Sequence, residues 1–197
     1  MKGKKRLKGE ERRTPITQIT TLRPLPDTLL TEAVSVKLLW VYLLHKGVVT
    51  YSSYSLAEAL GLSQRVATAG LSRLRNQELG LITDLGERRA RVRAVYQAVV
   101  PRGNPTSSLA LGTDAPRDPP HLSEALKSET PTTRLVYLYL EPYGEVEVSV
   151  RQLEALLGIS HRNAAEALRR LTQSALLKVL EPATSRPGRY LVQALEK

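Results

Sequence analysis

Hydrophobic positions in the first third of the chain recur at helical spacing. Leu38, Val41 and Tyr42 fall on one face, and this stripe predicts a buried helix that ends at Gly47. The stripe lies in the longest apolar run, Leu38 to Leu44, which is far shorter than the roughly 20 residues that span a bilayer. The pattern therefore predicts a buried helix of a globular domain and no membrane segment.

Two shorter helices are predicted to follow. Ser55 and Glu58 form a capping-box pattern, so the second helix is expected to begin near Ser55. Gly61 follows as a residue that adopts a left-handed turn, and Ser63 is placed to cap a third helix. The inward positions of this third helix stand at i, i+4 and i+7, and they are Ala67, Leu71 and Leu74. The short link between the two helices is typical of a helix-turn-helix.

Beyond Gly80 the pattern changes from helical to alternating, which predicts a β-hairpin. One strand carries Leu81, Thr83 and Leu85 on one face, and the next carries Val92, Ala94, Tyr96 and Ala98 on one face, with Arg91, Arg93 and Gln97 facing the other way. The connecting turn, residues 86–89, carries two arginines. Three helices followed by a basic hairpin indicate a winged helix-turn-helix unit.

The stretch 37–74 recurs without insertion at 134–171, an offset of 97 residues, with about 15 of the 38 paired positions identical. A period near a hundred residues is too long for a solenoid repeat and fits a small domain. The sequence therefore predicts an α+β fold, mostly α, with two tandem winged helix-turn-helix domains joined by a Pro-rich linker. The predicted segments are a basic arm and extended lead-in at 1–30, a first domain at 31–100, a linker at 101–129 and a second domain at 130–197.

The second copy repeats the helix signals of the first. Its capping residues are Thr130 with Pro131 at the first helix, Ser149 with Gln152 at the second, and Ser160 at the third. Its hairpin is predicted to run through 178–180, turn near Pro187 and Gly188, and return through 190–195. A short helix is also expected around 122–127, inside the linker.

Positive charge is concentrated toward the start of the chain. The net charge is +10, and residues 1–13 carry seven Lys or Arg against two Glu, while residues 31–100 carry nine cations against five acids. This is the footprint of a protein that binds a polyanion. The cations of the arm that are expected to contact DNA are Lys2, Lys4, Lys5, Arg6 and Lys8. The absence of cysteine and of a signal-peptide pattern favours a cytoplasmic, nucleoid-associated protein.

Groups suited to catalysis or metal binding do not cluster in the sequence. His45, His121 and His161 are scattered without the spacing of metal ligands. There is no phosphate-binding loop, nucleophile elbow or zinc motif. We therefore expect no enzymatic activity, no metal and no cofactor.

The segment from Ser55 to Ile82, SLAEALGLSQRVATAGLSRLRNQELGLI, resembles the winged helix-turn-helix domains of bacterial DNA-binding regulators and plasmid replication proteins. With both copies counted, the resemblance covers about two thirds of the chain. In that family the third helix lies in the major groove, and the hairpin wing contacts the backbone or the minor groove. The resemblance implies contacts with double-stranded DNA from Gln64, Arg65, Thr68, Ala69 and Ser72 in the first copy, and from His161, Arg162, Ala165, Glu166 and Arg169 in the second.

These residue types suit DNA contacts on physical grounds. Gln pairs with adenine and Arg with guanine, while Thr or Ala touches the thymine methyl group. The arginines of the predicted wings suit phosphates or a narrow minor groove, and they are Arg88, Arg89, Arg91 and Arg93 in the first copy and Arg186 and Arg189 in the second. The N-terminal arm adds minor-groove contacts.

The sequence favours a transcriptional regulator that places two recognition helices on DNA from one chain, as an internal pseudo-dimer or as a homodimer of chains. One alternative is a plasmid or phage replication initiator that binds direct repeats. A second alternative is a scaffold whose second domain recruits a protein partner. This last reading rests on Glu166, which repels phosphate, and on the balance of nine cations against seven acids in residues 131–197.

Overall fold

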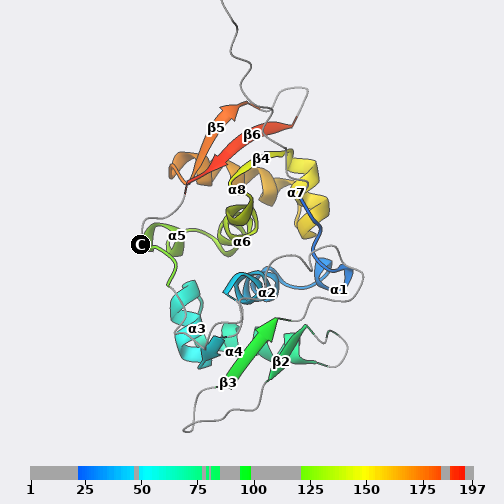
Figure 1. Cartoon of the computed structure of the whole chain (residues 1–197), viewed down its shortest axis with the longest axis vertical. Helices are drawn as coiled ribbons and strands as arrows, with labels where there is room; N and C mark the ends of the chain where they lie inside the picture. Colours follow the sequence, from blue (N-terminus) through cyan, green and yellow to red (C-terminus); the bar gives the residue numbers. More distant parts are fainter. Residues whose placement is uncertain are drawn as a thin grey trace, which may run out of the picture.

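The computed structural model contains two halves built from the same succession of elements (Figure 1). It describes residues 22–46, 49–76, 79, 81–84, 94–98, 121–182 and 187–193. The basic arm, the first wing turn and linker residues 101–120 lie outside this range. In Figure 1 the two sheets lie at opposite ends of the long axis, with helices between them.

The first half runs from a short helix to a three-stranded sheet. Its elements are α1 (Asp27–Leu30), α2 (Val34–Lys46), β1 (Val49–Tyr51), α3 (Ser53–Leu60), α4 (Gln64–Arg75), β2 (Ile82–Asp84) and β3 (Ala94–Ala98). The sheet is antiparallel in the order β1-β3-β2. Tyr96 of the central strand lies opposite Val49 on one side and Asp84 on the other.

The second half repeats this order. Its elements are α5 (Glu124–Lys127), α6 (Pro131–Leu140), the 3-10 helix η2 (Glu141–Tyr143), β4 (Glu145–Val148), α7 (Val150–Leu157), α8 (His161–Gln173), β5 (Leu177–Glu181) and β6 (Gly188–Val192). Its antiparallel sheet has the order β4-β6-β5. The prediction of an α+β fold that is mostly helical is therefore confirmed, and α5 is the short helix expected near the end of the linker.

Serine and threonine caps set where the helices begin. The predicted caps at Ser63, Thr130, Ser149 and Ser160 are confirmed, since each side chain accepts from a backbone amide of the first turn. The capping box predicted at Ser55 and Glu58 is wrong. Ser52 is the N-cap of α3 instead, and its Oγ accepts from the Ser55 amide at 3.0 Å while Ser55 Oγ accepts from the Ser52 amide at 3.1 Å. Serine thus takes the place that Glu or Gln usually holds in the box.

Three further expectations differ from the structure. The lead-in was predicted to be extended through residue 30, but α1 begins at Asp27, because Pro26 precedes the helix and breaks none of its hydrogen bonds. Strands β1 and β4 were not predicted, although buried Val146 and Val148 of β4 alternate with half-buried glutamates. The second hairpin is present as β5 and β6, but Gly188 does not lie in its turn, because it begins β6 and pairs with Val148.

The buried apolar residues of both halves form one continuous cluster. Helices α2 and α6 pack against each other at its centre. Trp40 and Tyr137 hold equivalent positions on these helices and are both fully buried. Leu122 and Leu126, at the end of the predicted linker, belong to the same cluster, and full burial of such a side chain contributes about 1.5 to 3 kcal/mol. Residues 121–129 are therefore part of the folded body and not a spacer.

In each half, the segment that leads into the short first helix contacts the other half. The Leu25 amide donates to the Leu156 carbonyl at 2.9 Å, and the Leu122 amide donates to the Ala59 carbonyl at 3.0 Å. Leu25 and Leu122 are 97 residues apart, as are Ala59 and Leu156. The segment that leads into α1 therefore pairs with α7 in the same way as the segment that leads into α5 pairs with α3, and the contact is reciprocal.

A second reciprocal contact is made by two buried cations. Lys37 Nζ donates to the Gly158 carbonyl at 2.7 Å. At the equivalent position of the other half, Arg134 donates through Nη1 to the carbonyls of Gly61, at 2.8 Å, and Leu60. Gly61 and Gly158 are the C-caps of α3 and α7, and the free carbonyls at a helix C-terminus attract cations. Burial lowers the pKa of both Lys37 and Arg134.

These reciprocal contacts define an approximate two-fold axis between the halves. An interface is isologous when the same two patches meet twice with their roles exchanged, as the patches around Lys37 and Gly158, and Arg134 and Gly61, do here. In Figure 1, α3 and α7 accordingly lie on opposite sides of the central α2–α6 pair. The two halves of one chain are thus related to each other as the two subunits of a two-fold dimer are.

Candidate nucleic-acid interface

Helix α4 has one buried face and one exposed face. Ala67, Leu71 and Leu74 are buried, and α4 packs on α2. Gly70 allows a close approach, since a Cβ at this position would overlap the side chain of Leu39. The predicted contact residues all lie on the exposed face, and they are Gln64, Arg65, Thr68, Ala69 and Ser72.

Helix α8 repeats this arrangement against α6. Ala164, Leu168 and Leu171 are buried, and α8 packs on α6. The predicted contact residues again lie on the outer side, with His161, Arg162 and Arg169 exposed and Ala165 and Glu166 partly exposed. The helical period therefore predicted the orientation of both helices correctly.

Arg65 and Arg162 are equivalent residues, each the second residue of its helix. Both residues are exposed to solvent. Neither makes a hydrogen bond or ion pair with any residue that the structure describes, whereas the arginines about two turns later, Arg73 and Arg170, bind Glu32 and Glu129. The starts of α4 and α8 thus each present one cation that is not neutralised within the described part of the chain.

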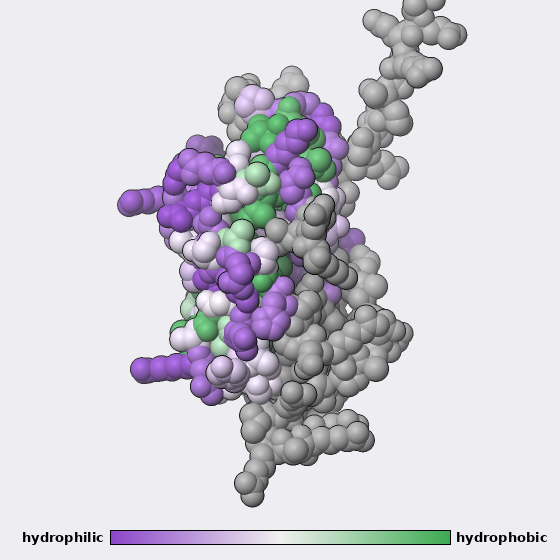
Figure 2. Space-filling model, turned by 90° about the vertical axis from the view of Figure 1, so that its left-hand side faces the viewer, coloured by the Kyte–Doolittle hydropathy of each residue, from purple (hydrophilic) through white to green (hydrophobic). Residues whose placement is uncertain are grey.

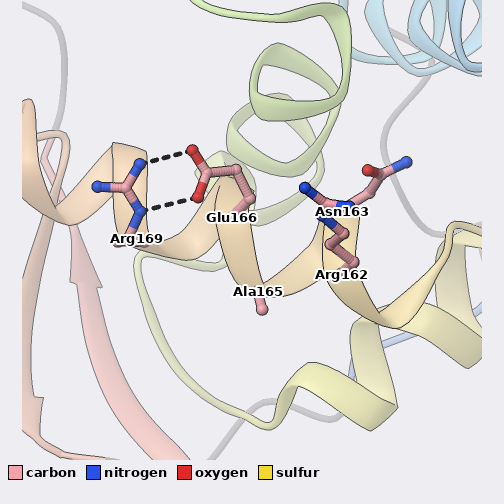
Figure 3. A pocket seen from close by; sticks show the side chains of 5 residues that line it. All are labelled: Arg162, Asn163, Ala165, Glu166 and Arg169. Carbon is pink, nitrogen blue, oxygen red and sulfur yellow. Dashed lines mark hydrogen bonds and ion pairs between the residues drawn. The ribbon is translucent and has the colours of Figure 1, made fainter.

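The outer face of α8 also carries an ion-pair network beside an open concavity of about 680 Å³ (Figure 3). Glu166 accepts from Arg169 Nε at 2.8 Å and Nη2 at 2.6 Å, and from Arg170 Nε at 2.9 Å. The hydrogen bonds from Arg169 and then Arg170 lower the pKa of Glu166 to about 2. Arg169 also donates to Gln173. The carboxylate is therefore ionised but neutralised by two guanidinium groups.

Figure 3 separates this network from the start of the helix. Arg162 and Asn163 lie one turn nearer the N-terminus of α8 than the pair of Glu166 and Arg169, and no interaction joins them to it. Of the two arginines predicted to contact DNA from α8, Arg162 is available and Arg169 is held by Glu166. His161 lies beside Glu154, with Nδ1 3.2 Å from the carboxylate.

The only predicted wing arginine within the described range is Arg189, on β6. Its guanidinium is bound by Glu145 and Glu181, and hydrogen bonds to these two carboxylates raise its pKa. Its charge is thus neutralised within the sheet. The other wing and arm cations lie outside the described residues, and they are Arg88, Arg89, Arg91, Arg93, Arg186, Lys2, Lys4, Lys5, Arg6 and Lys8.

Val66 and Asn163 were missed by the sequence analysis. They are the third residues of α4 and α8 and hold equivalent, exposed positions next to the two free arginines. Val66 alone reads as a core residue of an amphipathic helix. The polar Asn163 in the same register of the repeat is the signal that this position faces outward.

Apolar side chains reach the surface at a few other places. The face in Figure 2 is largely hydrophilic, with green patches that are most extensive near its upper end, where the second sheet lies. On β5 of that sheet, Val179 and Leu180 are each 38% exposed. Tyr54, on α3, is 63% exposed.

None of the described helices is long and apolar enough to cross a bilayer. Comparisons of the chain with protein families, with curated proteins and with solved structures found no match.

Proposed function

We propose that each half is a winged helix-turn-helix unit and that the protein binds double-stranded DNA with sequence preference, using α4 and α8 as recognition helices. The observation that carries this proposal is the pair Arg65 and Arg162, exposed and without partners among the described residues at the same position of both helices. The cellular role that we propose is transcriptional regulation.

The position of these arginines is unfavourable for helix stability. The N-terminus of a helix carries a partial positive charge, so a cation in the first turn loses about 0.3 to 1 kcal/mol relative to favourable placement. Arg65 and Arg162 occupy that turn in both halves. Stability therefore gives no reason for arginine here, whereas an anionic ligand does, because the arginine and the free amides of the first turn attract it together.

The surrounding side chains match the edges of bases in a major groove. Arginine donates two hydrogen bonds to guanine, and Gln64 and Asn163 are each able to make two with adenine. Val66 and Thr68 are suited to the thymine methyl group. These side chains and the two arginines, six residues in all, are exposed on the outer faces of α4 and α8, so a duplex reaches them without any rearrangement of the core.

We expect Arg65→Ala and Arg162→Ala each to weaken binding by about 1 to 3 kcal/mol at a specific site. The site is a duplex that the protein selects from a random pool, and affinity is measured by fluorescence anisotropy. Arg65→Lys and Arg162→Lys are the matched controls, because they keep the charge and lose the two-pronged contact with guanine. An equal loss on selected and random duplexes would contradict base reading and leave only a phosphate contact.

Glu166→Gln tests whether α8 faces the duplex. Removing this carboxylate frees Arg169, while Arg170 keeps its ion pair with Glu129. We therefore expect tighter binding and a plot of log affinity against log salt that is steeper by about one. Mild acid is no substitute, because the pKa of Glu166 is about 2. Glu124→Gln removes the same charge from α5 and is the control. Equal effects of the two variants would show that only net charge acts.

A second candidate function is the binding of a protein partner by the second half. It is favoured by the exposed Val179 and Leu180 on β5 and by the neutralised Arg189 beside them. The two candidates are separated by Arg162→Ala, which leaves DNA affinity unchanged if α8 does not contact DNA. Deletion of residues 130–197 is unsuitable, because it uncovers the apolar face of α2 that packs on α6.

A further inference from the structure

We infer that one chain recognises an inverted repeat, in which two unequal half-sites face each other across a dyad. This inference rests on the proposed DNA binding. It follows from how the two halves are oriented, and it separates the protein from an initiator that reads direct repeats with one chain.

The orientation is established by contacts that occur twice with their roles exchanged. Lys37 of the first half binds the C-cap of α7, while its equivalent Arg134 binds the C-cap of α3. Leu25 pairs with α7, while its equivalent Leu122 pairs with α3. Halves related by translation would make one contact of each pair and not the other. Only a two-fold operation produces both.

A two-fold axis also fixes how α4 and α8 are presented. The operation leaves unchanged the component of any direction along the axis and reverses the components across it. The outer faces of α4 and α8 therefore have the same tilt along the axis and opposite directions across it. A duplex has the same symmetry at a dyad through its grooves, and for this reason dimeric helix-turn-helix proteins bind palindromic sites.

The halves cannot turn to fit a direct repeat without losing the shared core. Lys37 and Arg134 are both buried, and each donates to a carbonyl of the opposite half. Helices α2 and α6 belong to one apolar cluster. Reversing one half would expose that cluster and leave the helix C-caps without their cations, so the two-fold arrangement is the one that meets DNA.

The two half-sites are unequal because the helices share few outward residues. Arg65 and Arg162 are both arginines and hold positions related by the two-fold axis. We therefore assign to each a guanine at the same distance from the dyad, one on each side. The neighbouring positions differ, because Gln64 is equivalent to His161 in the repeat and Val66 is equivalent to Asn163. The site is therefore a pseudo-palindrome whose shared feature is this pair of guanines.

The test is a selection of bound sequences from a random duplex pool by the full-length chain, followed by sequencing. The expected result is an enriched motif of two half-sites in inverted orientation at a fixed spacing. Enrichment of two half-sites in the same orientation, or of a single half-site, overturns the inverted repeat while leaving DNA binding intact. Failure to retain any duplex at low salt overturns the proposed function and this inference together.

Repeating the selection with single variants assigns each half-site to its helix. Arg65→Ala is expected to remove the guanine preference from one half-site, and Arg162→Ala from the mirrored position of the other. Substituting that guanine in the duplex should weaken binding of the unmodified chain roughly 5- to 150-fold, and should have little effect on the variant that lacks the matching arginine. Loss of both guanines in either variant would contradict the assignment.

Discussion

Gly158→Ala is expected to lower the free energy of unfolding by about 2 to 5 kcal/mol, through strain of about 1 to 2 kcal/mol and overpacking of about 1 to 3 kcal/mol. Gly158 has a left-handed backbone with φ of 57°. A Cβ here would lie 2.8 Å from the Leu30 Cα and would overlap the Leu30 carbonyl. Because the obstacle is backbone, α1 has to move away from the turn before α8.

Gly61→Ala is the matched control, because Gly61 is the equivalent residue with nearly the same backbone, φ 63°. Its added Cβ would meet Arg134 Nη1 at 3.0 Å and the side chain of Lys127 at 3.2 Å, and side chains yield more readily than backbone. We expect a smaller loss, of about 1 to 2 kcal/mol. Urea unfolding at equilibrium measures both variants. Equal losses would contradict the tight docking of α1 on the second half.

Both substitutions are expected to shift a single unfolding transition. The apolar residues of the two halves form one cluster, so neither half keeps its core when the other unfolds. A stability of about 5 to 15 kcal/mol is usual for a folded protein, and the effect of Gly158→Ala is a large part of it. Two separate transitions would mean that the halves unfold independently.

Local features of the fold were predictable because they depend on neighbours in sequence. Capping by Ser63 and Ser160 and the buried face of α4 follow from residues within one helix. The error at Ser55 has the same local origin, since Glu58 looked like the better partner. Alignment of the repeat pairs Ser52 with Ser149, and this comparison would have located the cap correctly.

The exchange of the short helices was not predictable from pattern. Leu25 and Leu122 are equivalent, and so are their acceptors Ala59 and Leu156. An equivalent backbone carbonyl is present in both halves. Sequence alone therefore does not say whether each leucine binds the carbonyl of its own half or that of the other half. The packing of α2 on α6 decides the matter, and that contact joins residues about a hundred positions apart.

At the candidate site, the sequence predicted which residues face outward but not which of their charges are neutralised by ion pairs. Helical period placed Arg162 and Arg169 on the outer face of α8 correctly. Glu166 was interpreted as a repulsive group, although its spacing of three and four residues from Arg169 and Arg170 is the spacing of helical ion pairs. The pairing neutralises Glu166 and occupies Arg169 at the same time, so Arg162 is the cation that α8 offers.

Arg134→Ala is expected to lower the free energy of unfolding by about 3 to 5 kcal/mol, because each hydrogen bond from a charged group contributes about 1.5 to 3 kcal/mol before desolvation is offset. The guanidinium donates to the carbonyls of Leu60, Gly61 and Glu129. Alanine removes the donor from these three acceptors, of which the Leu60 carbonyl is in a buried place, and opens a cavity between the halves. Urea unfolding at equilibrium measures the loss.

The chain supplies its own control for Arg134, because Lys37 holds the equivalent position with two carbonyl acceptors, Leu30 and Gly158. Arg134→Lys should therefore keep the cation at the C-terminus of α3 and lose only about 1 kcal/mol. If lysine and alanine lowered the free energy of unfolding equally, the shape of the guanidinium and not its charge would be what stabilises the contact. If alanine were harmless, the C-cap of α3 would not depend on the second half, and the reciprocal contact would be incidental to stability. A large loss with alanine and a small one with lysine identifies a cation at the C-terminus of α3 as an element that joins the two halves.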